Sequence, residues 1–195
     1  MKRESLNKFI FVYAILISLF HFYQNIWGGM SNLWFNAAHF SLLASLGFLT
    51  FRASKHSDQT KVPIYDIILA VVTSSVVVYM MFFEQSLYTV AHSNMRPFDL
   101  IYASLSILLA LEILRRTTGY IIPTMIIIAV GYLLYFGKLL EGVFAFRGMS
   151  VERFLYRMYY TGEGLFGSIA TISATYVFMF ILFSAFLMKS GAGDF

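Results

Sequence analysis

The sequence contains no cysteine, and only 12% of its residues are charged. The lack of cysteine excludes structural disulfides, thiolate metal sites and a cysteine nucleophile. GxSxG, HExxH and P-loop patterns are missing as well, so neither a membrane hydrolase nor an ATP-driven pump has a motif to support it. We therefore predict that the chain is not an enzyme and holds no cofactor of its own.

The composition is instead that of a membrane protein. Hydrophobic residues make up 59% of the chain, aromatic residues make up 18%, and the mean hydropathy is +0.73. These values lie far from the balance of a soluble domain. The net charge of +4 is too small and too scattered to indicate nucleic-acid binding, so we expect a lipid bilayer and no nucleic acid as partner.

Six apolar stretches have about the length that crosses a bilayer as a helix, which takes ~20 residues. They predict an all-α integral membrane protein with six transmembrane helices: Phe9–Trp27, Leu33–Phe51, Ile64–Phe83, Phe98–Leu114, Tyr120–Phe136 and Ile169–Leu187. The first is not expected to be a cleaved signal, because its apolar run continues into FHFYQNIW and no small-residue cleavage site follows.

The distribution of Lys and Arg predicts a cytoplasmic N terminus. Basic residues concentrate on the cytoplasmic side of membrane proteins. With six crossings, nine of them fall on that side: Lys2, Arg3, Lys8, Arg52, Lys55, Lys61, Arg115, Arg116 and Lys189. Arg96 and Arg147 then lie in outer loops, where exposure and charge make them candidate contacts for a partner outside the membrane.

A short amphipathic helix is predicted between the fifth and sixth spans. Ser150 can cap it, and an apolar stripe at i, i+3, i+4, i+7 follows at Val151, Phe154, Leu155 and Met158. Such a segment can lie in the outer membrane interface. An ordinary loop helix packed on protein fits the pattern equally well.

Ionisable side chains deep in a membrane are usually functional because burying them is costly. The acidic residues of the spans all lie within about a turn of a span end: Asp66, Glu84, Asp99 and Glu112. Glu112 can pair with Arg115 or Arg116 at i+3 and i+4. We interpret the four carboxylates as structural, which leaves no proton relay or cation site in mid-span.

Two histidines fall at similar predicted depth in the first two spans. His21 and His39 could ligate a b-type haem or a metal. A histidine among Phe20, Phe22 and Phe40 is more often a packed amphipathic residue, and no second pair occurs. We therefore assign no catalytic, substrate, cofactor or metal residue.

Small residues at helical spacing predict close helix packing. They recur at i, i+4, i+8 in two faces: Ala37, Ser41 and Ser45, and Gly167, Thr171 and Thr175. Faces of this kind let membrane helices approach closely.

The strings GEGLFG, SATYVFMFILF and SGAGDF, after Gly162, resemble the opening of the large permease segment in fused tripartite ATP-independent periplasmic (TRAP) transporters, TAXI type. The string RRTTGYIIPTMIIIAVGYLLYFGKLLEG resembles the linker of that family. Ser184 departs from the usual glycine but keeps a small side chain. The match before Arg115 rests on span number and position more than on residues.

The resemblance implies three parts: 1–116 as a small permease subunit-like four-helix scaffold, 117–148 as a linker span and outer loop, and 149–195 as an arm helix and the first, truncated part of the large permease. It implies cation-driven (Na⁺ or H⁺) uptake of organic acids across a bacterial or archaeal inner membrane. The implied partners are the remainder of the large permease and a periplasmic substrate-binding protein. Two alternatives are a small non-transporting membrane subunit of another tripartite carrier and a membrane cytochrome or enzyme.

Overall fold

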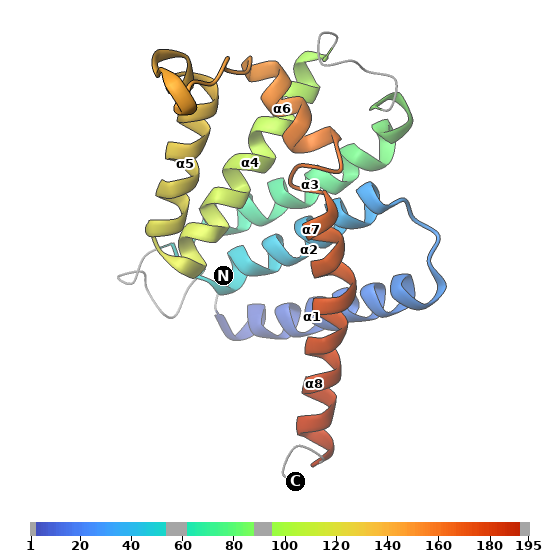
Figure 1. Cartoon of the computed structure of the whole chain (residues 1–195). Coiled ribbons are helices and arrows are strands. Elements are labelled where there is room, and N and C mark those ends of the chain that lie inside the picture. Colours follow the sequence, from blue (N-terminus) through green and yellow to red (C-terminus); the bar gives the residue numbers. More distant parts are fainter. Residues whose placement is uncertain (1–2, 54–61, 88–94, 192–195) are drawn as a thin grey trace.

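The computed structural model describes residues 3–53, 62–87 and 95–191, with the side chains of 3–5 and 84–87 left aside. Over these residues the chain is all-helical. The side chain of Glu84 and most of the string SGAGDF therefore lie outside the described part. Figure 1 shows α1 crossing the last helix, which continues beyond α1 toward the C terminus.

Five helices of the described chain are long and apolar enough to cross a membrane. They are α1 (Arg3–Trp27), α2 (Asn32–Thr50), α3 (Ile64–Leu87), α4 (Pro97–Thr118) and a continuous C-terminal helix made of α7 (Ser168–Ile172), a π-helical turn η4 (Ser173–Val177) and α8 (Phe178–Ser190). The prediction of an all-helical chain with apolar spans is confirmed to that extent.

The predicted span Tyr120–Phe136 is a shorter helix than the others. Helix α5 covers Ile121–Leu134, which are 14 residues. At 1.5 Å per residue it is about 21 Å long, less than the ~30 Å of a hydrocarbon core. Two 3₁₀ turns follow, η2 (Phe136–Leu139) and η3 (Gly142–Phe144), and this segment folds back on α5. The described residues therefore form five helices of spanning length, where the sequence predicts six.

The fold-back after α5 is held by hydrogen bonds to the helix end. The Phe146 amide donates to the Gly137 carbonyl at 2.9 Å, and the Tyr132 hydroxyl donates to the Phe144 carbonyl at 2.7 Å. A Cβ on Gly137 would lie 2.8 Å from the Phe146 Cβ, so the close approach depends on glycine.

Local sequence signals set the helix ends. Gly28 and Gly29 adopt positive φ between α1 and α2, a conformation that glycine reaches without strain. The Ser31 hydroxyl then accepts from the Trp34 amide and caps α2. At α4, Pro97 occupies the first turn, and the Asp99 carboxylate accepts from the Arg96 amide at 2.8 Å.

The core lies between α2, α3, α4 and α6 (Val151–Tyr160), with α2 and α3 in the most extensive contact. Its largest fully buried side chains include Phe48, Met80, Tyr159 and Phe166. A Cβ on Gly47 would lie 2.7 Å from the Ile113 Cδ1 atom, so α2 and α4 approach closely there.

One face of helix α6 packs against the rest of the protein. Ser150 caps it as predicted, its hydroxyl accepting from the Arg153 amide. Phe154 and Leu155 of the predicted stripe are buried, whereas Val151 is exposed. Tyr159 is buried as well, and the helix packs against α4. The alternative of a loop helix packed on protein therefore describes the contacts of α6.

Substituting Ser41 tests the packing of α2. Its side chain is fully buried, and its hydroxyl has no hydrogen-bond partner among the described residues. We expect Ser41→Leu to lower the free energy of unfolding by about 1–3 kcal/mol, because a larger side chain forces α2 away from its neighbours. Ser41→Ala should be nearly neutral, and Ser18→Leu, at a half-buried position of α1, should have a smaller effect. Thermal unfolding in detergent measures this; equal shifts for both leucine variants would contradict it.

Candidate functional site: a polar junction at the last helix

Buried and half-buried polar side chains join the C-terminal helix to α1 and α2. We call this cluster the polar junction, and it consists of His21 and Asn25 on α1, Asn36 and His39 on α2, and Thr171 and Ser173 on the C-terminal helix. It lies among apolar residues of three helices that are long enough to cross a membrane. Polar contacts between helices in such surroundings are specific, because each group has few alternative partners.

The two histidines form a hydrogen-bonded chain with a single direction. His21 Nδ1 lies 2.8 Å from the Ile17 carbonyl, which can only accept, so Nδ1 carries the proton. In a neutral ring His21 Nε2 is then an acceptor, and His39 Nδ1, at 2.8 Å, donates to it. His39 Nε2 is left to accept from the Ser173 hydroxyl at 3.1 Å. Both imidazoles are therefore Nδ1–H tautomers, and all four ring nitrogens have a partner.

Aromatic rings enclose this chain. The Phe178 ring stacks on His21 at 4.2 Å between centroids, and the Phe35 ring lies 5.5 Å away. His21 is fully buried, and His39 is only 7% exposed. These contacts keep the histidines away from other polar groups.

This arrangement does not fit the haem or metal alternative. The two imidazoles are hydrogen-bonded directly to each other, so no porphyrin fits between them. Within the described residues no three His, Asp or Glu side chains gather in a metal-binding group. The sequence singled out His21 and His39 together, but it did not predict that they touch.

Asn36 attaches the start of the C-terminal helix to α2. Its amide Nδ2 lies within hydrogen-bond distance of three acceptors, and one of its two N–H groups is shared between two of them: the Phe166 carbonyl at 2.7 Å, the Gly167 carbonyl at 3.1 Å and the Thr171 hydroxyl at 2.8 Å. These acceptors belong to the two residues before α7 and to its first turn, so the buried amide holds the entry of the C-terminal helix in place.

Asn25 attaches the π-helical turn to α1. Its amide donates to the Ala174 carbonyl at 3.2 Å and to its own helix at the His21 carbonyl, 2.8 Å away. A π-turn shifts backbone hydrogen bonds out of the α-helical register, and such turns are frequent at functional sites. The turn η4 thus coincides with the polar junction.

The predicted packing residues occupy two places. Ala37, Ser41 and Ser45 are buried in α2, and Ser45 also contacts the Tyr13 hydroxyl of α1 at 2.7 Å. Gly167 and Thr171 lie against Asn36, whereas the Thr175 hydroxyl donates to the Thr171 carbonyl of its own helix. Sequence reasoning missed Asn25 and Asn36, although an asparagine within an apolar span is itself a signal.

The string GEGLFG is a turn that requires two of its glycines, Gly164 and Gly167. A Cβ on Gly164 would lie 2.2 Å from the Met158 carbonyl oxygen, and one on Gly167 would lie 2.2 Å from the Gly162 carbonyl oxygen. Either would overlap with backbone. The Leu165 amide donates to the Met158 carbonyl at 2.7 Å, so the turn fixes the end of α6 against the start of α7.

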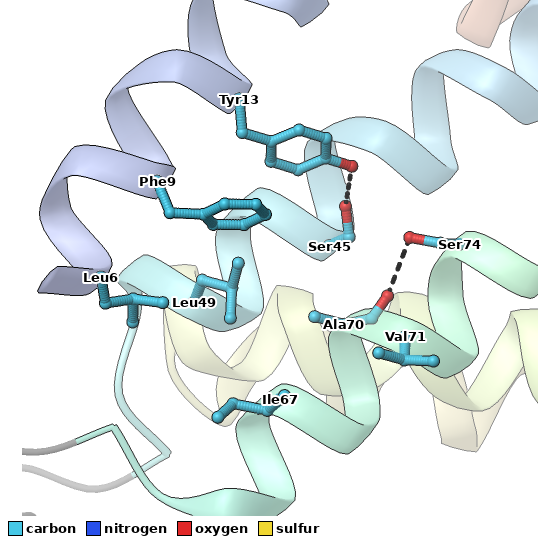
Figure 2. Close-up of a pocket in the computed structure, with 9 residues that line it drawn as sticks. All are labelled: Leu6, Phe9, Tyr13, Ser45, Leu49, Ile67, Ala70, Val71 and Ser74. Atoms are coloured by element: carbon cyan, nitrogen blue, oxygen red, sulfur yellow. Dashed lines mark hydrogen bonds between the residues drawn. The ribbon is translucent and has the colours of Figure 1, made fainter. Parts of the chain in front are cut away.

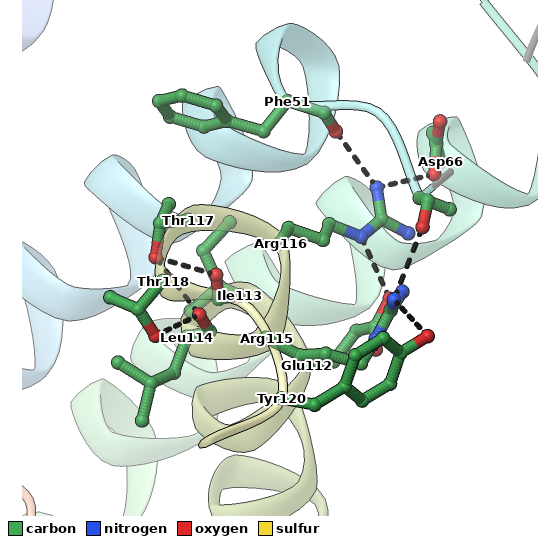
Figure 3. Close-up of polar contacts among 11 residues, drawn as sticks. Phe51, Asp66, Glu112, Ile113, Leu114, Arg115, Arg116, Thr117, Thr118 and Tyr120 are labelled. Carbon is green, nitrogen blue, oxygen red and sulfur yellow. Dashed lines mark hydrogen bonds and ion pairs between the residues drawn. The ribbon is translucent and has the colours of Figure 1, made fainter. Parts of the chain in front are cut away.

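A second polar cluster joins the ends of α2, α3 and α4 (Figure 3). The Arg116 guanidinium contacts both Asp66 and Glu112 at 2.7 Å, and Arg115 contacts Glu112 at 2.8 Å. The predicted pairing of Glu112 is confirmed, and the contact of Arg116 with Asp66, 50 residues away, is new. Arg116 also donates to the Phe51 carbonyl at the end of α2.

An aromatic cluster connects α6 to α3 and α4. The Tyr79 hydroxyl donates to the Asp99 carboxylate, and the Tyr79 ring stacks on Tyr102 at 4.0 Å. Tyr159 and Tyr160 of α6 lie near these groups, and burial raises the pKa of both hydroxyls well above the usual value. Both hydroxyls stay protonated at any physiological pH, so the two tyrosines that α6 contributes to this cluster are uncharged.

Comparisons with family models, with curated proteins and with solved structures find no match. An inference about function therefore rests on these contacts and on the resemblance seen in the sequence.

The direction of the histidine chain can be measured. In protein labelled with ¹⁵N-histidine, we expect His21 and His39 to be neutral Nδ1–H tautomers, because the Ile17 carbonyl fixes the first proton and the rest follows. His39→Gln, which removes one signal, assigns the spectrum. An Nε2–H tautomer at either residue would contradict the chain as described.

Substituting the arginines tests the second cluster. The Arg116 side chain is 1% exposed and that of Asp66 is 4% exposed, so Arg116→Met leaves a buried carboxylate without its cation. We expect a loss of about 3–5 kcal/mol in the free energy of unfolding. Arg115→Met, at a side chain 22% exposed, should cost about 1 kcal/mol or less. Asp66→Asn should restore part of the stability of Arg116→Met. Equal unfolding temperatures for the two arginine variants would show that burial of the pair adds nothing.

Proposed function

We propose that the chain is the membrane scaffold of a TRAP-type secondary transporter, which serves cation-driven, binding-protein-dependent uptake of organic acids. Two of the strings that resemble the family, GEGLFG and SATYVFMFILF, lie in the turn before the C-terminal helix and in that helix. The observation that carries the proposal is the polar junction, which fixes this helix to α1 and α2 by side chains of its first half.

The exposure of the last helix supports a scaffold role. In the stretch Ser168–Ser190 only 6% of the most apolar window is buried. Phe180, Phe183 and Phe186 are all more than half exposed. A helix anchored at one end, with apolar side chains free along the rest, suits a segment on which further membrane helices or lipid pack. The resemblance makes the remainder of the large permease the expected occupant.

The distribution of charge supports the absence of a transport site in this part. The described carboxylates of the long helices, those of Asp66, Asp99 and Glu112, lie near helix ends and already have partners. Cation-coupled transport uses ionisable groups or irregular backbone near the midplane, often at broken helices. In the proposal the substrate and the coupling ion, Na⁺ or H⁺, bind to the large permease.

The proposal includes a topology. The N terminus is cytoplasmic, α5 with the 3₁₀ turn after it makes a linker crossing, and α6 lies as an arm helix near the outer interface of a bacterial or archaeal inner membrane. The exposed Glu152 and Arg157 on α6 suit contact with headgroups or water. Arg96 and Arg147 are then candidate contacts for the periplasmic binding protein.

Reconstitution tests the proposal. We expect proteoliposomes with this chain alone to accumulate no organic acid under a Na⁺ or H⁺ gradient. Uptake should require a complete large permease and its periplasmic binding protein. In that assembly Asn36→Leu should reduce uptake, because it leaves the Phe166 carbonyl and the Thr171 hydroxyl without this donor, a loss of about 1–3 kcal/mol.

Asn32→Leu is the matched control, since Asn32 is exposed at the start of the same helix. Hydrogen exchange should increase in residues 168–177 of Asn36→Leu only. Gradient-driven uptake by the chain alone would overturn the scaffold role, and equal uptake by the two variants would overturn the role of the polar junction.

A further inference from the structure

An apolar pocket lies between the first three helices (Figure 2). One face of α1 contributes Leu6, Phe9 and Tyr13 at i, i+3 and i+7, and α2 and α3 form the other walls. Its volume is about 440 Å³. That is roughly three times the ~150 Å³ of a dry apolar cavity that binds benzene. The space is therefore large enough for a section of hydrocarbon chain.

The pocket wall offers no free hydrogen-bond donor to a ligand. Ser45 donates to the Leu42 carbonyl at 2.9 Å, so the Tyr13 hydroxyl is the donor in its 2.7 Å contact with Ser45. The Ser74 hydroxyl donates to the Ala70 carbonyl at 3.0 Å. Every hydroxyl in the wall thus already donates its proton to another group of the protein. A polar molecule would lose its own hydrogen bonds here, whereas a hydrocarbon chain would lose none.

The pocket opens to the outside of the helix bundle. Phe9 and Val71 line it and are 55% and 66% exposed. Because α1, α2 and α3 have the length and composition of membrane spans, this side faces lipid in a bilayer. The molecules that reach the opening are then lipids.

Two basic residues follow or precede lining residues of the pocket closely in the sequence. Lys8 is exposed and precedes Phe9 on α1, and Arg52 follows α2 one turn after Leu49. The nearest described carboxylate on α3, that of Asp66, is already paired with Arg116. Positive charge at the end of an apolar groove is complementary to an anionic headgroup above an acyl chain.

We propose that this pocket binds one anionic phospholipid, with an acyl chain between α1, α2 and α3 and the headgroup near Lys8 and Arg52. The site needs only placement in a membrane, so it does not depend on the proposed transport role. Its acyl chain fills the space between α1 and α3, which line opposite sides of the pocket.

Native mass spectrometry of the full chain, purified from vesicles of phosphatidylglycerol or phosphatidylcholine, tests the site. We expect one retained phosphatidylglycerol per chain. Val71→Phe, which fills the opening, should abolish retention. Val78→Phe is the matched control, because Val78 is also exposed on α3, lies two turns away and does not line the pocket.

The double variant Lys8→Gln, Arg52→Gln separates headgroup from chain binding. Its affinity for phosphatidylglycerol should fall roughly thirtyfold, because each basic residue near an anionic lipid contributes about fivefold. Its affinity for phosphatidylcholine should not change. Equal retention by the two phenylalanine variants would overturn the pocket as the site, and equal affinity of the native chain for both lipids would overturn the anionic headgroup. Neither result bears on uptake, so the site can fail while the proposed function stands.

Discussion

The attachment of the C-terminal helix depends on a few hydrogen bonds that cross between helices where water is scarce. Asn25 and Asn36 donate to backbone carbonyls of the π-helical turn and of the helix start, and His39 meets Ser173. In an apolar environment a lost partner is not replaced by water, so each bond specifies one position of the helix. Apolar contacts in the same region add area but allow many positions.

Two polar clusters, one at each end of α2, attach this helix to its neighbours. At its start, Asn36 holds the C-terminal helix; after its end, the Phe51 carbonyl accepts from Arg116, which ties α2 to α3 and α4 through Asp66 and Glu112. Between them, small side chains such as Ala37 and Ser41 allow close packing. Helix α2 is therefore the element that the other long helices share, and most of its length is buried.

Local chemistry could be predicted from the sequence, and long-range pairing could not. Apolar runs predicted the five long helices of the described residues, and Ser150 predicted the cap of α6, because these features depend on neighbouring residues. The 14-residue α5 was predicted too long, since an apolar run does not reveal where the chain folds back on itself. The contacts of Asn36 span more than 130 residues, and no periodicity encodes which carbonyl a buried amide meets. Asp66 and Arg116 pair for the same reason without any local signal.

The hydrogen-bonded chain from Ser173 to Ile17 has a consequence for acidity. With one proton on each ring, all hydrogen bonds of the chain run in one direction. A third proton, on His39 Nε2, is accommodated when the Ser173 hydroxyl turns from donor to acceptor. A fourth proton, on His21 Nε2, would point at the Nδ1–H group of His39. The pair therefore has room for a single positive charge without movement of any heavy atom, and a second would push α1 and α2 apart at the point where the last helix is attached.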